Sequence, residues 1–290
     1  MKAPGCAGEK SVLVVRSVIF NVAFYLVLFI YLIAALPTLL LPYRAIIEVA
    51  KSWGRVSNWL LRVICGTRVE FRGVEKIPRG ALLVAAKHQS MWETFAIIAL
   101  FADPAFIIKR ELMWLPFFGW YTWKGRMIPV DRGARGVALA GLARSAGVAF
   151  ANGRQIIIFP EGTRRPAGAE PNYKYGVVHL YAETGAACLP VALNSGLFWP
   201  RRSFLRYPGT IRLEILDPIP PGLDKQAFAA ELRERIETAT ARLVAEGERD
   251  LIARGLVPIT ARPGGSHAGP ADAPPEDAAR SRDSRVPRAP

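Results

Sequence analysis

An uncharged apolar run near the start of the chain limits its fold more than any other feature. Residues 17 to 43 carry no charged side chain, and residues 18 to 41 form 24 almost unbroken apolar positions. As an α-helix this run would extend about 36 Å, at about 1.5 Å per residue, which is long enough to cross a bilayer. It is too long for the apolar core of a secretory signal, and no small-residue cleavage site follows it. The run therefore predicts a retained membrane anchor.

Two prolines leave the geometry of this anchor open. Pro37 and Pro42 each remove a backbone hydrogen bond and kink or end a helix, so a spanning helix and a hairpin that enters one leaflet both fit. A helix buried in a protein core has a similar composition, although the length of the run argues against it. Lysines and arginines lie on both sides of the run, so flanking charge does not decide its orientation.

The chain is strongly basic. It has 38 Lys and Arg against 24 Asp and Glu, which gives a net charge of +14, and residues 261–290 contribute little of it. Anionic partners are therefore expected, whether nucleic acid, anionic lipid or phosphorylated metabolites. Hydrophobic residues make up 51% of the chain and charged residues 21%, which excludes a chain that is disordered throughout.

The three cysteines, Cys6, Cys65 and Cys188, lie far apart in the sequence. This spacing argues against a disulfide framework and against a zinc site, and it fits a reducing compartment. With the apolar run, it leads us to expect a protein of the inner (cytoplasmic) membrane whose folded domain lies on the cytoplasmic side.

The order of the predicted elements indicates an α/β domain. A linking helix follows the apolar run to about residue 62, and strand-like runs then alternate with helical stretches up to residue 260. Residues 261–290 are rich in proline and poor in large apolar side chains, so they predict a disordered tail. The predicted strands are Arg68–Phe71, Ala81–Ala86, Ala105–Ile108, Met127–Val130, Gln155–Phe159, Cys188–Leu193 and Ile211–Ile215. The predicted helices are Trp92–Phe101, Arg135–Asn152, Lys174–Thr184 and Gln226–Gly247.

A histidine and an acid occupy one of the predicted strand-to-helix junctions. His88 and Glu93 are five residues apart, which would place them about 140° apart on a regular helix. The two side chains can meet only if His88 precedes the helix and Glu93 lies in its first turns. A carboxylate bonded to one imidazole nitrogen raises the basicity of the other, and this would make a general base. A structural role for the pair fits the spacing equally well.

The string from Phe159 to Arg164 follows another predicted strand. Pro160 ends the strand, Gly162 allows a sharp turn, and the Arg164 guanidinium can hold a phosphate through two N–H donors. A surface turn without a ligand has a similar composition.

Two further blocks complete the pattern. Residues 124–132 place Arg132 beyond a strand end, and residues 189–193 form a strand that contains a proline. The order and spacing of the four blocks resemble the glycerolipid acyltransferase family, specifically 1-acyl-glycerol-3-phosphate (lysophosphatidic acid) acyltransferases. The resemblance covers roughly residues 60 to 220.

The resemblance implies a fold and a set of roles. The fold is a mixed sheet flanked by helices, with the N-terminal segment in or against the membrane. His88 would be the catalytic base and Glu93 its partner. The family usually has Asp at the second position, so the helix here must lie slightly further from His88 to accommodate the extra methylene of Glu93. Residues 189–191 would lie near the acyl donor. The residues that would hold the glycerol phosphate are Arg132, Glu161, Gly162, Thr163 and Arg164.

The implied reaction needs no cofactor and no metal. His88 would deprotonate the free hydroxyl of 1-acyl-sn-glycerol-3-phosphate, which attacks the thioester of acyl-CoA or acyl carrier protein and gives phosphatidic acid for phospholipid synthesis. The alternative acceptor is another lysolipid, such as lyso-ornithine lipid. Arg132 and Arg164 favour an acceptor that carries a phosphate.

Two alternative functions have weaker support in the sequence. A serine hydrolase lacks support, because the chain contains no G-x-S-x-G string. A basic domain that only binds anionic lipid would need neither His88 nor the string at residues 159–164.

The sequence leaves two possible locations open for an aromatic stretch and for one lysine. The aromatic stretch 114–123 suits either an interfacial belt or acyl groove, or a protein core. Lys109 suits either the phosphate site or a solvated surface.

Overall fold

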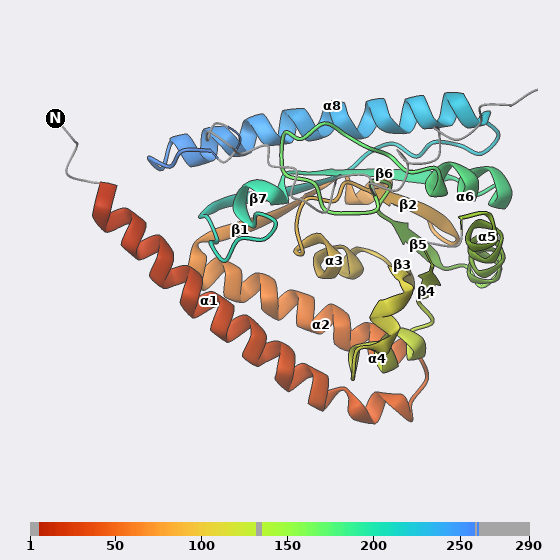
Figure 1. The fold of residues 1–290 in the computed structure, drawn as a ribbon, viewed down its shortest axis with the longest axis horizontal. Coiled ribbons are helices and arrows are strands. Elements are labelled where there is room, and N and C mark those ends of the chain that lie inside the picture. The colour runs from red at the N-terminus through yellow and green to blue at the C-terminus, as the bar shows by residue number, and fades with distance from the viewer. Residues whose placement is uncertain (1–5, 132–134, 259, 261–290) are drawn as a thin grey trace, which may run out of the picture.

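The computed structural model describes residues 6–131, 135–258 and 260, and a seven-stranded sheet between layers of helices forms its centre (Figure 1). All seven predicted strands are present, each with ends within two residues of the prediction, which confirms the α/β fold. The strands are β1 (Thr67–Arg72), β2 (Leu82–Ala86), β3 (Pro104–Lys109), β4 (Ile128–Val130), β5 (Gln155–Ile158), β6 (Cys188–Leu193) and β7 (Gly209–Ile215).

The helices follow the predictions less closely. The stretch predicted at 92–101 divides into a four-residue helix and a 3₁₀ turn at Ile97–Leu100, and the last helix is longer at both ends than predicted. The predicted tail at 261–290 lies outside the described residues. The helices are α1 (Cys6–Ala34), α2 (Arg44–Leu60), α3 (Glu93–Ala96), α4 (Phe118–Lys124), α5 (Arg135–Ala151), α6 (Gly176–Thr184), α7 (Ser195–Phe198) and α8 (Lys225–Ile252).

The sheet is mixed and has the strand order β1-β7-β6-β2-β5-β3-β4. Only the β6–β7 pair is antiparallel, so the five neighbouring strands β6, β2, β5, β3 and β4 all run in one direction. The loops that follow these five strands consequently leave the same edge of the sheet. Three of the four sequence blocks reach this edge after β2, β4 and β5, and the fourth forms β6.

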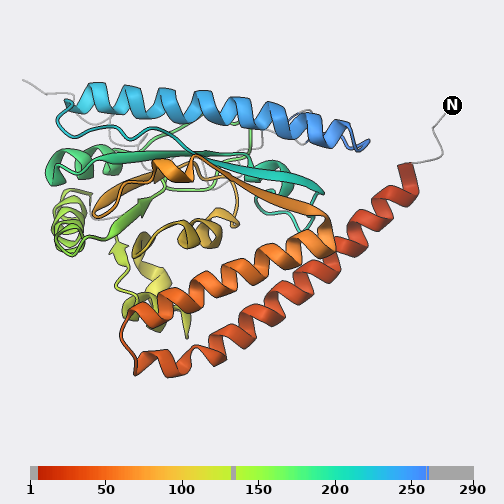
Figure 2. The ribbon, with the colours of Figure 1, turned by 180° about the vertical axis from the view of Figure 1, so that it is seen from behind.

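Strand β2 separates two apolar layers. Leu82, Val84 and Ala86 face the core that includes Phe95 of α3, whereas Leu83 faces the core that includes Phe228 of α8. The two views show α8 on one face of the sheet and α2 and α3 on the other (Figures 1 and 2). This alternation determines which way each residue after β2 points, because successive side chains on a strand face opposite sides.

The N-terminal segment forms a helical hairpin. Helix α1 ends at Ala34, before the end of the apolar run at residue 41, because Pro37 lies in a 3₁₀ turn from Leu36 to Leu39. The chain then returns beside α1 as α2 (Figure 2). Residues Lys10–Ala34 are long and apolar enough to cross a membrane.

Helix α1 also docks on the sheet domain. Phe20 and Phe24 are fully buried in the core on the α3 side of the sheet. The side chain of Asn21 donates to the Phe204 carbonyl at 2.7 Å and accepts from Arg206 at 2.9 Å. Since Arg206 is itself buried against aromatic rings, these contacts fix the register of the helix on the domain.

Arg154 joins three separate segments inside the domain. Its side chain is 3% exposed, and it pairs with Asp103 at 3.0 Å while donating to the carbonyls of Pro104, Gly125 and Arg126 at 2.8–3.0 Å. The pair connects the starts of β3 and β5 to the turn before β4. Losing one partner would leave a charge buried without compensation.

We therefore expect Arg154→Met to lower the free energy of unfolding by about 3–5 kcal/mol. Arg144→Met is the matched control, because Arg144 is exposed on α5 and such a surface change is worth about 0.5 kcal/mol or less. Thermal or denaturant unfolding of the purified proteins in detergent measures both. Equal stability of the two variants would contradict this role of Arg154.

Candidate active site

The predicted contact between His88 and Glu93 is present. His88 lies in the loop after β2, and Glu93 is the first residue of α3, so the strand-to-helix break brings the two side chains together. His88 Nδ1 lies 3.0 Å from Glu93 Oε1. This bond assigns the proton to Nδ1 and leaves Nε2 as the basic nitrogen, which has no hydrogen bond to the described residues.

The Glu93 carboxylate is fully buried and holds the whole loop. Its Oε1 atom also accepts from the backbone N–H groups of Gln89 and Ser90 at 2.6 Å each. Its Oε2 atom accepts from the hydroxyl of Ser195 at 2.8 Å. Four donors surround one carboxylate, so its position is well defined.

The imidazole ring is also fixed by stacking. Phe159 lies parallel to the His88 ring, with the centroids 3.9 Å apart and the planes 14° apart. Gly162 then turns the chain with a left-handed φ of 67° and donates its N–H to the Phe159 carbonyl at 2.9 Å. The string 159–164 therefore lies directly beside His88, and its turn favours glycine at position 162.

Glu161 of the same string points into the protein. Its side chain is 0% exposed, and it accepts from Lys87 Nζ at 3.0 Å and from the His88 backbone N–H at 3.4 Å. The pKa of the Glu161 carboxyl is raised by burial, and Lys87 opposes that shift. Glu161 therefore contacts Lys87 and the backbone of His88 inside the protein.

The other predicted site residues differ in how well they are positioned. Thr163 and Arg164 are half-buried and follow the turn at Gly162. Lys109 ends β3 and forms an exposed ion pair with Glu111 at 3.0 Å. Arg132 follows β4 but lies outside the described residues.

The predicted donor block is a core strand. The side chains at positions 189–191 are fully buried in β6, where this block pairs with β2 at Val84, Ala85 and Ala86. Ser195, two residues beyond the end of β6, contacts Glu93. The sequence did not point to this serine, because only the sheet order reveals that the end of β6 lies beside the end of β2.

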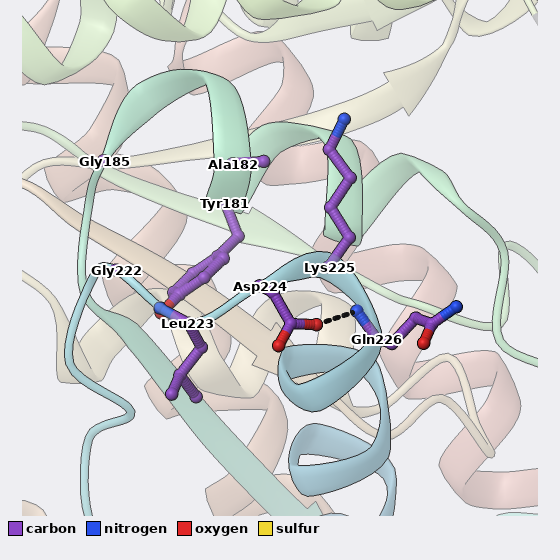
Figure 3. Close-up of a pocket in the computed structure, with 8 residues that line it drawn as sticks. All are labelled: Tyr181, Ala182, Gly185, Gly222, Leu223, Asp224, Lys225 and Gln226. Atoms are coloured by element: carbon purple, nitrogen blue, oxygen red, sulfur yellow. Dashed lines mark hydrogen bonds between the residues drawn. The ribbon is translucent and has the colours of Figure 1, made fainter.

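The described residues offer no metal-ligand set at this site, and a surface pocket lies apart from it. Among the described residues, no group of three or more His, Cys, Asp or Glu side chains has the arrangement of a metal site. A surface pocket lies between the end of α6 and the start of α8, lined by residues that include Tyr181, Leu223 and Asp224 (Figure 3). Asp224 there accepts from the N–H groups of Gln226 and Ala227, as a helix cap does. None of the predicted site residues lines this pocket.

Comparison with known proteins identifies the family of the chain. Residues 68–194 match the family model described as Acyltransferase. A 1-acyl-sn-glycerol-3-phosphate acyltransferase of Pseudomonas aeruginosa is 37% identical over 208 residues, which are 71% of this chain and 81% of that protein. The human 1-acyl-sn-glycerol-3-phosphate acyltransferase alpha is 26% identical over 212 residues, or 71% of this chain and 73% of the human protein.

The fold has a counterpart among solved structures. The crystal structure of the 1-acyl-sn-glycerophosphate (LPA) acyltransferase PlsC from Thermotoga maritima superposes with a TM-score of 0.67 at 24% identity, covering 79% of this chain and 96% of that one. At this identity the likeness concerns the fold alone. The similarity to the Pseudomonas protein extends over most of both chains, and the chain belongs to the acyltransferase family that contains these enzymes.

Proposed function

We propose that the protein transfers an acyl chain to the free hydroxyl of 1-acyl-sn-glycerol-3-phosphate and produces phosphatidic acid. The observation that carries this proposal is the His88–Glu93 pair, held at the sheet edge beside the turn at residues 159–164. Enzymes with this activity are similar to the chain over most of its length. The donor is the thioester of acyl-CoA or of acyl carrier protein.

His88 acts as general base through Nε2. It takes the proton of the acceptor hydroxyl while the oxygen attacks the thioester carbonyl, so that a C–O bond forms and the C–S bond breaks. The proton on His88 then passes to the leaving thiolate. Glu93 keeps the ring in the required tautomer and stabilises the imidazolium that forms during the reaction.

The acceptor phosphate binds beside this base. Arg164 follows the turn at Gly162 and, within the described residues, forms no ion pair with an acidic side chain, so its guanidinium is available for two parallel bonds to a phosphate. We assign Thr163 to the same phosphate, and also Arg132, which lies outside the described residues. Lys109 adds positive charge from the end of the neighbouring strand β3. Glu161 supports the loop from beneath.

A lysolipid panel tests this function. Wild-type membranes should acylate lysophosphatidic acid from labelled acyl-CoA or acyl carrier protein, and mass spectrometry should identify phosphatidic acid as the product. His88→Ala should reduce turnover by about a hundredfold or more. Glu93→Gln should be less severe, because an amide can orient the ring but cannot stabilise imidazolium.

Three outcomes would contradict the proposal. Preferred acylation of lyso-ornithine lipid by the wild type would assign a different acceptor. Near-normal turnover of well-folded His88→Ala would remove the proposed base, and unchanged turnover of Glu93→Gln would remove its partner.

Arg164→Lys tests the phosphate site. Lysine supplies a point charge without the paired donors of a guanidinium, so the KM for lysophosphatidic acid should rise about tenfold while the KM for the acyl donor stays within about twofold. Steady-state kinetics with each substrate varied in turn measures both constants. Arg144→Lys, an exposed change on α5, is the matched control. A larger rise in the donor KM would assign Arg164 to the donor.

The hairpin of α1 and α2 anchors the enzyme in one leaflet. The face of α1 that carries Phe20 and Phe24 is packed on the domain, whereas the opposite face exposes large apolar side chains, including Val22, which is 64% exposed, and Phe29, which is 61% exposed. A helix attached to the domain along one face is poorly placed to cross the bilayer alone. Its outer face suits the acyl region of the nearer leaflet.

The aromatic stretch extends this surface. Tyr121 donates to the Leu32 carbonyl of α1, and Lys124 donates to the Leu39 carbonyl at the hairpin turn, at 2.8 Å. Trp114 and Trp123 of the same stretch are 79% and 70% exposed. Tryptophan favours the depth of the lipid headgroups, so we assign these side chains to the membrane interface.

The hairpin arrangement gives a topology that can be measured. Alkaline carbonate should leave the protein in the membrane pellet, and N-terminal and C-terminal tags should both be digested by protease added to inside-out vesicles. Removal of residues 261–290 should keep activity. Release by carbonate would indicate peripheral binding, and tags on opposite sides of the membrane would indicate a spanning helix.

A further inference from the structure

Lys87 and His88 are neighbours whose side chains point to opposite faces of the sheet. Because side chains alternate in direction along β2, His88 points toward Glu93 on the α3 side, whereas Lys87 points toward α8. The Lys87 side chain is 3% exposed. Its Nζ atom lies 3.0 Å from Glu161 Oε1, and 2.8 and 3.0 Å from the two carboxylate oxygens of Glu237.

The His88 backbone depends on this buried cluster. Glu161, which pairs with Lys87, also accepts from the His88 N–H at 3.4 Å. Four residues later, the N–H of Arg165 donates to the His88 carbonyl at 2.8 Å. The backbone N–H and C=O groups of His88 are therefore both held by the segment that follows β5, and Lys87 connects this segment to α8.

Glu237 completes the cluster from α8, a helix outside the four sequence blocks. Tyr173 donates its hydroxyl to Glu237 Oε1 at 2.8 Å, which orients that carboxylate toward Lys87. A buried ammonium between two carboxylates has a defined place only while both partners remain charged and bonded. Without Glu237, Lys87 would keep only Glu161 as a charged partner and would pull on the carboxylate that supports His88.

We propose that Glu237 and Tyr173 are positioning residues for His88, acting through Lys87 and Glu161 from the opposite face of the sheet. This inference rests on the proposed role of His88 as the base. Catalysis by a general base is sensitive to placement, and a displacement of about 1 Å can reduce turnover by about a hundredfold. Glu161 belongs to the same loop as Arg164, so an effect that acts through His88 is recognised by a fall in kcat with little change in the KM of the acceptor.

The test compares Glu237→Gln, Tyr173→Phe and the control Glu234→Gln, which changes an exposed acid on the same helix. Rates are expressed per folded molecule, quantified by size-exclusion chromatography and melting temperature. Glu237→Gln should lower kcat about ten- to hundredfold, with the KM for acceptor and donor within about twofold of wild type. Tyr173→Phe should have a smaller effect in the same direction. The double variant should be no slower than Glu237→Gln, because Tyr173 acts through Glu237.

The results separate this inference from the proposed function. The assay uses whichever lysolipid the wild type acylates, so a different acceptor would overturn the proposed substrate and leave the positioning test intact. Wild-type kcat in folded Glu237→Gln would overturn the inference. So would a loss that merely follows the folded fraction, or a rise in KM alone. If Glu237→Gln fails to fold, an unchanged kcat in Tyr173→Phe would overturn it as well.

Discussion

The buried carboxylate of Glu93 is the interaction on which the site depends. It lies at the start of a four-residue helix and accepts bonds from His88, from two backbone N–H groups of the preceding loop and from Ser195. A buried charge is stable only with such partners, so the loop, the imidazole and the end of β6 must all adopt these positions together. The same contacts give His88 a single tautomer. The need of this buried carboxylate for hydrogen-bond partners thus explains both the conformation of the loop and the orientation of the proposed base.

The hairpin is part of the same arrangement. Trp92, next to Glu93, donates its indole N–H to Asn58 of α2 at 2.8 Å. Gly54 of α2 approaches so closely that an added Cβ would lie 2.8 Å from the Phe95 carbonyl oxygen of α3. The proposed membrane anchor therefore packs directly against the helix that carries Glu93. With the hairpin anchored as proposed, a lipid acceptor would reach the base from the layer in which its acyl chain dissolves.

Buried ions act as connectors throughout the molecule. Arg154 joins β3, β5 and the turn before β4, Arg206 joins the loop at residues 203–207 to α1, and Lys87 joins the segment after β5 to α8. Burial lowers the pKa of Arg206 to about 10, which still leaves it charged at neutral pH. Each of these side chains has several donors and reaches oxygen acceptors on more than one segment. Some of the basic side chains of this chain therefore stabilise the fold, in addition to those available for anionic ligands.

The sequence by itself determined the strands, the apolar N-terminal helix and the His88–Glu93 contact. These features are local: alternation, length and a five-residue spacing across a strand-to-helix break fix them without knowledge of distant segments. The tertiary structure alone decided that the N-terminal helix docks through Asn21 and that Ser195 completes the Glu93 site. It also decided that Glu161 lies beneath His88 while Glu237 approaches from α8. Sheet order and helix docking bring these residues together over separations of about 70 to 185 positions. Many strand orders satisfy the same hydrophobic pattern, and only the packing of both faces selects one of them.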